Sequence, residues 1–157
     1  MKIRRATIED AALLAALNVT VQQLHYEQRP DVFKPPQVSE DIVQFFQDAL
    51  SEPENHLFIC EVDEQPVGYI HLKIIHRPEN PFTHALDEVL IDQISVNADQ
   101  QSKGCGQALM QAAYDLARQE NIHRIVLGVW EFNTGAIDFY RKQGFHTFYQ
   151  RMELLLE

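Results

Sequence analysis

Residues 96–106 read Val-Asn-Ala-Asp-Gln-Gln-Ser-Lys-Gly-Cys-Gly and stand between a strand-like run and a helical pattern. Glycines at positions 104 and 106 let the backbone approach a ligand closely. The first turn of the following helix points unpaired N–H groups, and the positive end of the helix dipole, toward the same place. The stretch therefore predicts an anion site, with Lys103 as the nearest cation.

Other phosphate-binding loops fit this stretch less well. A Walker A loop requires Gly-Lys-Ser/Thr, whereas the order here is Lys103-Gly104-Cys105. A Rossmann fingerprint requires a third glycine where Leu109 stands. Because isolated glycine patterns are common, the loop alone is also compatible with a strand-to-helix turn that binds nothing.

The flanking segments predict a strand–helix–strand unit. Asp87 to Val96 alternates as a long strand, Gly106 to Gln119 carries an apolar helical stripe, and Ile125 to Trp130 reads as a second strand. A strand, a crossover helix and a strand place the two strands parallel, with a right-handed crossover. On plain alternation, Val89, Ile91 and Gln93 are expected on one face of the first strand.

The rest of the chain predicts further helices and hairpins around this unit. Thr7 and Asp10 form a capping-box pattern before a helix that ends near Gln28, and Ser39 opens a second helix. The remaining expected elements are an extended Lys2 to Ala6, strands at Leu57 to Val62 and Val67 to Ile75, a helix at Asn133 to Gln143, and a closing hairpin of Phe145 to Phe148 and Arg151 to Leu155. The fold class is α/β of the mixed α+β kind: a mostly antiparallel sheet of six to seven strands, about four flanking helices and one parallel pair.

Composition narrows the class of protein. A length of 157 residues with 45% hydrophobic residues suits one domain over residues 1–157. The formal charge of -10 and the absence of Lys/Arg clusters argue against nucleic-acid binding, and no apolar run is long enough to cross a membrane. Cys60 and Cys105 lack metal-ligand spacing, and the seven histidines form no ligand pair, so we expect no metal, no structural disulfide and a cytoplasmic location.

A second motif indicates what the loop at residues 96–106 could bind. Asn133-x-x-Ala136-x-x-x-Tyr140-x-x-x-Gly144-Phe145 follows the second parallel strand, as Gln101-x-x-Gly104-x-Gly106 follows the first. In this order and spacing the two motifs resemble the GNAT superfamily of N-acetyltransferases, in particular single-domain bacterial members. The resemblance is specific from Asp87 to Phe145; the N-terminal half agrees in the order of its elements and in the segment Arg29 to Lys34.

The resemblance implies acetyl-coenzyme A as cosubstrate and a splayed parallel strand pair that receives it. The strand before the loop would pair with pantetheine, the loop would hold the pyrophosphate, and Asn133 would contact the cofactor arm. The implied cofactor-binding residues are Ile94, Ser95, Val96, Gln101, Ser102, Lys103, Gly104, Cys105, Gly106, Gln107, Asn133, Ala136 and Tyr140.

The implied chemistry is direct attack of a primary amine in a ternary complex. An alkyl amine with a pKa near 10.4 costs roughly 4 kcal/mol to deprotonate at pH 7.5, so a base is desirable. The family position for a carboxylate base, acting through water, falls on Asp92, with Glu88 as the alternative. Tyr140 would be the general acid toward the thiolate, and a backbone N–H near Ile94 would serve the oxyanion. Each carboxylate could instead be a paired structural group, and Tyr140 a half-buried helix aromatic.

The acceptor is a small-molecule or peptidic amine that the sequence does not identify. Its candidate binding residues are Tyr26, Glu27, Asp31, Phe33 and His71, although loop carboxylates are usually solvated and His71 can be an ordinary half-buried histidine. A second copy of the chain is a candidate partner in a homodimer. The alternative function is a non-catalytic acyl-coenzyme A sensor or interaction module.

Overall fold

The computed structural model describes residues 1–156, and the chain divides into two compact units. The first unit, Met1–Leu127, contains a five-stranded sheet and three α-helices. The second unit begins at Gly128 and contains one α-helix.

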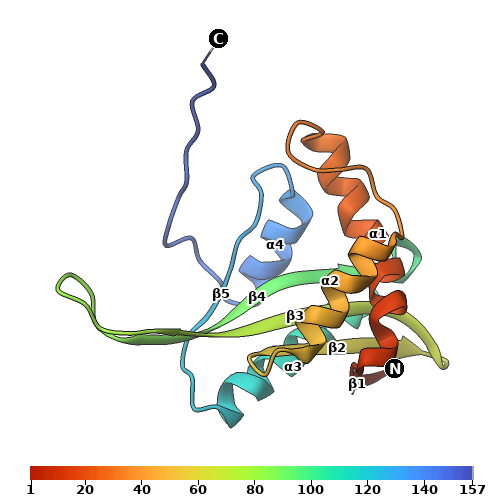
Figure 1. Cartoon of the computed structure of the whole chain (residues 1–157), viewed down its shortest axis with the longest axis horizontal. Coiled ribbons are helices and arrows are strands. Elements are labelled where there is room, and N and C mark those ends of the chain that lie inside the picture. The colour runs from red at the N-terminus through yellow and green to blue at the C-terminus, as the bar shows by residue number, and fades with distance from the viewer. Residues whose placement is uncertain (157) are drawn as a thin grey trace. The chain divides into compact units, whose positions relative to one another are not determined.

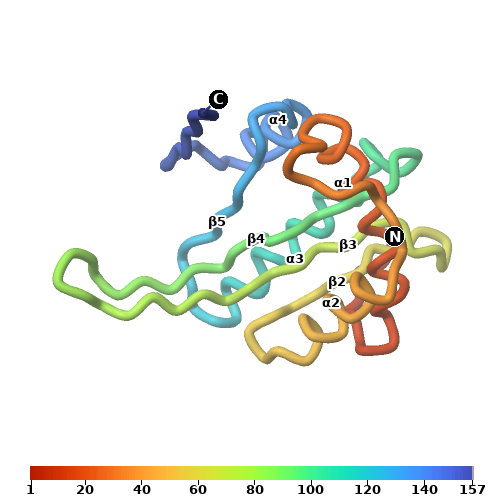
Figure 2. Tube along the Cα trace, turned by 45° about the horizontal axis from the view of Figure 1, so that its top comes forward, coloured from red at the N-terminus to blue at the C-terminus, as the bar shows by residue number. Residues whose placement is uncertain are grey.

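The sheet of the first unit is mixed and mostly antiparallel, as predicted (Figure 1). Neighbouring strands follow chain order, antiparallel up to the fourth strand and parallel between the fourth and fifth. Figure 2 shows that the third and fourth strands form a long hairpin that extends past the helices. The strands are β1 (Lys2–Arg5), β2 (Asn55–Val62), β3 (Gln65–Arg77), β4 (Leu86–Val96) and β5 (Ile125–Leu127).

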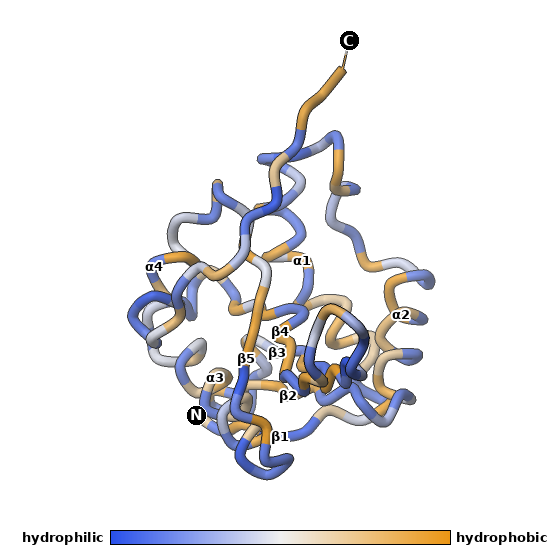
Figure 3. Tube along the Cα trace, turned by 90° about the vertical axis from the view of Figure 1, so that its left-hand side faces the viewer, coloured by the Kyte–Doolittle hydropathy of each residue, from blue (hydrophilic) through white to orange (hydrophobic). Residues whose placement is uncertain are grey.

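Helices cover both faces of this sheet (Figures 1 and 2). Helices α1 (Ala11–Gln28) and α2 (Glu40–Ser51) lie on one face, and α3 (Cys105–Gln119) lies on the other. The α1/α2 side has an apolar core in which Leu14, Phe46 and Tyr69 are fully buried. Figure 3 shows the matching pattern, with hydrophobic residues concentrated on the central strands.

The helix starts follow the sequence signals. The Thr7 backbone N–H donates to Asp10 Oδ2 at 2.8 Å, and this capping box opens a 3₁₀ turn, Ile8–Asp10, before α1. Ser39 caps α2 by accepting from the Ile42 backbone N–H at 3.4 Å. Both boundaries were predicted because a cap is a local interaction between residues close in sequence.

A β-bulge changes the predicted faces of β4. His71 pairs with Gln93, but the next residue of β3, Leu72, pairs with Ile91, so Asp92 is an extra residue on β4. Directly paired residues share a face, so Gln93 lies on the face of His71 whereas Ile91 lies on the opposite face with Leu72. The prediction that Ile91 and Gln93 share a face was therefore wrong, because simple alternation does not anticipate a bulge.

The second unit consists of α4 (Thr134–Lys142) and an extended C-terminal segment. Asn133 caps α4 by accepting from the Ala136 backbone N–H at 3.2 Å. Gly144, with φ of +93°, ends it, and the Phe145 N–H donates to the Tyr140 carbonyl oxygen at 3.1 Å, a Schellman closure.

The predicted closing hairpin at 145–155 was wrong, because these residues form no strand. Strand β5 is also shorter than predicted, so the described residues form five strands and not six or seven. A β-like sequence pattern favours an extended backbone, but a strand also requires a neighbouring backbone with which to pair.

Candidate functional site

The start of α3 presents backbone N–H groups without helical partners. Gly104 adopts φ of +90° as the residue before the helix, a left-handed conformation that favours glycine. The first N–H bonded inside the helix is that of Ala108, which donates to the Gly104 carbonyl oxygen at 3.0 Å. The amides of residues 105–107 therefore have no carbonyl in a preceding helical turn, which is the arrangement predicted for an anion.

The loop before α3 is tied to the end of β4. Gln101 Nε2 donates to the Val96 carbonyl oxygen at 3.2 Å, and Ser102 takes a positive φ of 62°. Lys103 is exposed beside them. The sequence-predicted loop residues 101–107 therefore form one continuous turn onto the N-terminus of α3.

The parallel strand pair separates as predicted. Strand β5 pairs with residues 89–91 of β4 and ends at Leu127, whereas β4 continues to Val96. Within residues 1–156 no strand pairs with that edge of β4 beyond Ile91. The Asn97 N–H donates to the Val67 carbonyl oxygen at 2.8 Å, so the alternation of an antiparallel ladder turns the N–H groups of Ile94 and Val96 toward the open edge.

Ser95 and Gln93 point the other way, toward α1. Ser95 Oγ donates to the Leu17 carbonyl oxygen at 2.8 Å, and the Tyr69 hydroxyl donates to Gln93 Oε1 at 2.6 Å. Asn18 Nδ2 in turn donates to the Tyr69 hydroxyl at 2.8 Å. These contacts fix the end of β4. Ser95 offers no free hydroxyl, and by the same alternation its backbone N–H and C=O face Tyr69 on β3 and not the open edge.

The bulge aims Asp92 at a polar cluster on the α1/α2 face. Asp92 Oδ1 lies 3.1 Å from Lys73 Nζ, and Asp92 Oδ2 lies 3.4 Å from His71 Nδ1. His71 Nε2 is 2.8 Å from Asn55 Oδ1, and the ring of Phe45 on α2 meets the imidazole edge-to-face at 6.4 Å between centroids. The side chain of Asp92 is 25% exposed, whereas that of His71 is fully buried. Solvent and ligands can therefore reach Asp92 but not the imidazole.

Glu88 occupies a different environment. It is 3% exposed, and its carboxylate contacts Arg77 at 2.6 Å and Arg124 at 3.4 Å. A buried carboxylate held by two guanidinium groups has little freedom to reach a substrate. Of the two candidate bases, Asp92 is the one that retains partial exposure.

Tyr140 lies in the second unit, on α4. Its ring packs edge-to-face against Phe139 and Phe145, with centroid separations of 5.4 and 5.7 Å. Burial raises the pKa of Tyr140 to about 12, which keeps the hydroxyl protonated at neutral pH. This is the protonation state that a general acid needs.

Comparison with known proteins identifies the family of the chain. The description of the family model that matches residues 19–145 is "Acetyltransferase (GNAT) family". The chain belongs to this family. It is 29% identical over 103 residues to an uncharacterized N-acetyltransferase of Methanocaldococcus jannaschii, a match that covers 64% of this chain and 43% of that protein. An uncharacterized N-acetyltransferase from Lactobacillus delbrueckii is 25% identical over 135 residues, 80% of this chain and 76% of that one. The match thus spans less than half the length of the archaeal relative.

Solved structures agree with the fold. A tetramutant of a Bacillus halodurans protein superimposes with a TM-score of 0.92 at 26% identity, covering 99% of this chain and 100% of that one. An aminoglycoside acetyltransferase from an uncultured soil sample, in complex with sisomicin, gives a TM-score of 0.68 at 16% identity over 99% and 95% of the two chains. At that identity the second likeness concerns the fold alone.

Three of the predicted acceptor-binding residues of this GNAT chain already contact nearby side chains. The Asp31 carboxylate accepts from Arg29 Nη2 at 2.8 Å, and Phe33 stacks on His25 with ring centroids 4.7 Å apart. Glu27 accepts a hydrogen bond from Gln23, and Tyr26 is half-buried. These four lie together at the end of α1 and in the loop after it, whereas His71 lies on β3.

Sequence reasoning missed Lys73 and Asn55. Lys73 could have been found, because it follows His71 by two residues on the same strand and therefore shares its face. Asn55 had no such signal, since its contact with His71 depends on the pairing between β2 and β3.

The two cysteines meet in the fold, although they are far apart in sequence. Cys60 on β2 and Cys105 at the start of α3 are both buried and free, and their thiols lie against one another. Burial, followed by the contact with Cys105, raises the pKa of the Cys60 thiol to about 12. Cys105 therefore packs its side chain inward while its backbone N–H belongs to the first turn of α3.

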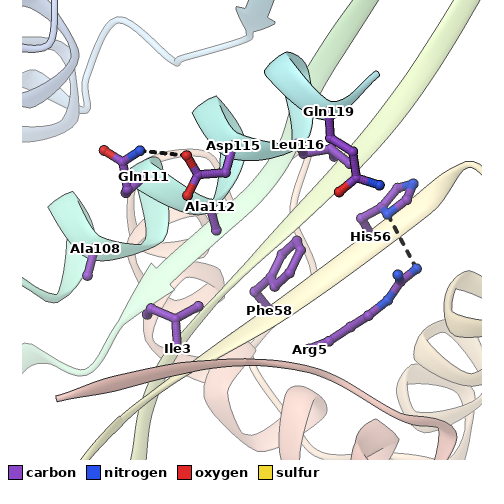
Figure 4. A pocket seen from close by; sticks show the side chains of 10 residues that line it. All are labelled: Ile3, Arg5, His56, Phe58, Ala108, Gln111, Ala112, Asp115, Leu116 and Gln119. Atoms are coloured by element: carbon purple, nitrogen blue, oxygen red, sulfur yellow. Dashed lines mark hydrogen bonds between the residues drawn. The ribbon is translucent and has the colours of Figure 1, made fainter. Parts of the chain in front are cut away.

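A separate pocket of about 400 Å³ lies between α3 and the β1/β2 edge of the sheet (Figure 4). Its lining is apolar at Phe58 and Leu116 and polar at Arg5, His56 and Asp115. Arg5 Nη2 lies 3.3 Å from His56 Nδ1, as Figure 4 shows. None of the sequence-predicted site residues lines this pocket, which lies at the opposite edge of the sheet from β4 and β5.

Among residues 1–156, no helix combines the length and apolarity that a membrane span requires. Over the same range, no three His, Cys, Asp or Glu side chains gather as metal ligands would.

Proposed function

We propose that the chain transfers the acetyl group of acetyl-coenzyme A to a primary amine. The observation that carries the proposal is the open edge of β4 beyond Ile91, which leads directly into the left-handed Gly104 and the free amides of α3. Family membership supports the assignment, because the matched region spans both motifs. We also propose that the two units act as one catalytic domain, since residues 19–145 cross their boundary.

The residues present fit a long, polyanionic thioester. Residues 105–107 offer backbone N–H groups to a pyrophosphate, and glycine at position 104 permits the turn that aims them. The outward N–H groups of Ile94 and Val96 offer ladder-type hydrogen bonds to an amide-bearing arm. Backbone donors also explain how a chain with a net charge of -10 would hold an anion.

The proposed mechanism needs one base and one acid from this chain. Acetyl-coenzyme A, when bound, supplies the acetyl group as an activated thioester. Asp92, partly exposed at the bulge, receives a proton from the acceptor ammonium directly or through one water. A backbone N–H near Ile94 donates to the carbonyl oxygen, and Tyr140 donates its proton to the departing sulfur. Glu88 is a structural carboxylate in this proposal, because it is already held by Arg77 and Arg124.

The acceptor is proposed to be a cationic small molecule or peptide amine. Glu27 and the residues around it at the end of α1 form an acidic and aromatic margin that would favour an ammonium group. Asp31 contributes less attraction than the sequence indicates, because Arg29 pairs with it.

The first test is calorimetric titration with acetyl-coenzyme A and, separately, with ATP. We expect saturable binding of the former and none of the latter. Gly104→Val should weaken acetyl-coenzyme A binding at least about tenfold, because a β-branched residue strongly disfavours a positive φ. Gly144→Val is the matched control, since Gly144 has a similar positive φ of +93° but is not among the residues proposed to bind the cofactor. Absence of binding by the unmodified chain would refute the proposal.

The second test is amine-dependent thiol release over a panel of amines. We expect Tyr140→Phe and Asp92→Asn each to lower kcat by about 10²-fold or more, with little change in acetyl-coenzyme A affinity. Tight binding with no amine-dependent release over the panel would favour the alternative, a non-catalytic acyl-coenzyme A sensor.

A further inference from the structure

His71 holds a buried acceptor atom for which the fold supplies no hydrogen. Its Nε2 lies 2.8 Å from Asn55 Oδ1, and an amide oxygen can only accept, so Nε2 carries the ring proton. Burial lowers the pKa of His71 to about 4, which leaves the ring neutral near pH 7. The Nδ1 atom is therefore a bare acceptor, and it makes no hydrogen bond.

The group that faces this acceptor is Asp92, with Oδ2 3.4 Å from Nδ1. Two acceptors at this distance gain nothing from each other until a proton lies between them. The other groups around the pair are Lys73, whose ammonium lies 3.1 Å from Asp92 Oδ1, Asn55 on β2 and Phe45 on α2. Lys73 thus holds one carboxylate oxygen of Asp92, whereas the bare Nδ1 faces the other.

We propose that His71 is a positioning residue whose Nδ1 receives the hydrogen bond of Asp92 once Asp92 has taken a proton from the acceptor amine. This inference rests on the proposed function. An N–H bond of the ammonium breaks and an O–H bond forms on Asp92 Oδ2, so the substrate loses its positive charge and Asp92 its negative charge. The new O–H donates to Nδ1, and the proton later passes to solvent through the exposed side of Asp92. No oxidant or reductant takes part.

The bulge makes this geometry available. Asp92 is the extra residue of β4, placed opposite the step from His71 to Leu72, and so it leans toward both His71 and Lys73. Asn55 holds His71 from the other side. Its amide oxygen accepts from Nε2 and so fixes which ring nitrogen carries the hydrogen. The buried imidazole thus acts on the substrate only through Asp92.

The kinetic test compares three variants by their pH profiles of kcat/KM for an amine. His71→Leu removes the acceptor, so we expect kcat/KM to fall about 10- to 100-fold and its acid limb to move to lower pH, with acetyl-coenzyme A affinity unchanged. His71→Gln restores an acceptor oxygen and should recover part of the rate. Lys73→Met is the opposite-sign control, since loss of the ammonium should move the acid limb to higher pH. A merely structural role would lower the rate of His71→Leu without moving the limb.

A measurement independent of turnover completes the test. Long-range ¹H–¹⁵N NMR of the unmodified protein at pH 7 should show His71 protonated at Nε2 and bare at Nδ1. Protonation at Nδ1 would overturn the role of His71 and leave acetyl transfer intact. A bare Nδ1 together with no amine-dependent thiol release would instead overturn the proposed function, and the proton-holding role with it.

Discussion

Gly68 lies against the backbone of Ser95, so that a Cβ on Gly68 would come within 2.6 Å of the Ser95 carbonyl oxygen. The two residues belong to β3 and β4, at the place where Gly68 pairs with Val96. This close approach fixes the position of the β4 segment whose outer edge is open. The absence of a side chain at position 68 thus bears directly on the geometry of the candidate site.

We predict that Gly68→Ala destabilises the chain by about 1–3 kcal/mol, because β3 and β4 must move apart to admit the methyl group. The same movement displaces Ile94 and Val96, so acetyl-coenzyme A affinity should fall as well. Urea unfolding and calorimetry measure the two effects. Gly128→Ala, with open space around position 128, should leave the unfolding midpoint unchanged. An unchanged midpoint in Gly68→Ala would show that this strand pair is not tightly constrained.

A second prediction concerns Arg4, a residue of β1 whose side chain contacts the carboxylates of both Asp10 and Glu61. Its guanidinium makes two 2.8 Å hydrogen bonds to Asp10 and one of 2.6 Å to Glu61. The hydrogen bonds from Arg4 lower the pKa of Asp10 to about 2. Because the folded pKa lies below the unfolded value of 3.8, the stabilisation is complete above about pH 4 and is lost as pH falls through about 2.

Asp10→Asn should therefore cost about 1–2 kcal/mol of unfolding free energy at pH 7, and the difference from the unmodified chain should shrink below pH 4. Denaturant unfolding at pH 7, 4 and 3 measures it. Asp48→Asn, an exposed carboxylate bonded to Gln44 on the same helix, should change stability by less than about 0.5 kcal/mol. A pH-independent cost would attribute the effect to capping geometry and not to the charge.

A third prediction follows from the neutral, buried His71. Its folded pKa of about 4 lies below the ordinary value of 6.5, so the unfolded chain binds the proton more tightly. Stability should fall as pH drops from about 6.5 to about 4, with His71 contributing about 1–3 kcal/mol of that loss. In His71→Gln, which cannot titrate, the decline over this window should be smaller by that amount. Parallel slopes for the two proteins would mean that His71 titrates as an exposed histidine.

The elements that were predicted correctly depend on residues close in sequence. Ser39 and Asn133 cap helices, and Gly144 ends one, through contacts that span only a few residues. The parallel pair followed from a strand–helix–strand order that permits one handedness. The position of Gly104 before α3 followed from the same unit.

The features that were not predicted depend on pairing between distant segments. The bulge at Asp92 is a register shift relative to β3, and no residue in β4 is of a type that would predict it. The two arginines at Glu88 come from β3 and from the residue before β5. The segment after Phe145 had a strand-like composition, yet the described residues give it no partner strand. In each case the sequence indicates a local conformation, and only the assembled sheet determines the contacts.

A fourth prediction concerns Cys60 and Cys105, whose buried thiols contact each other beneath the first turn of α3. The thiolate is the form that attacks a disulfide reagent, and the raised pKa of Cys60, about 12, leaves almost none of it at pH 8. Because both side chains are also buried, both cysteines should react with a disulfide reagent at least about 100-fold more slowly in the native chain than in urea. Reaction then requires the first turn of α3 to open, so acetyl-coenzyme A, which we propose binds that turn, should slow it further. Single variants Cys60→Ser and Cys105→Ser assign the rates. A native Cys105 that reacts as fast as in urea would mean that this turn is open in solution, and the proposed anion site would lose its preformed geometry.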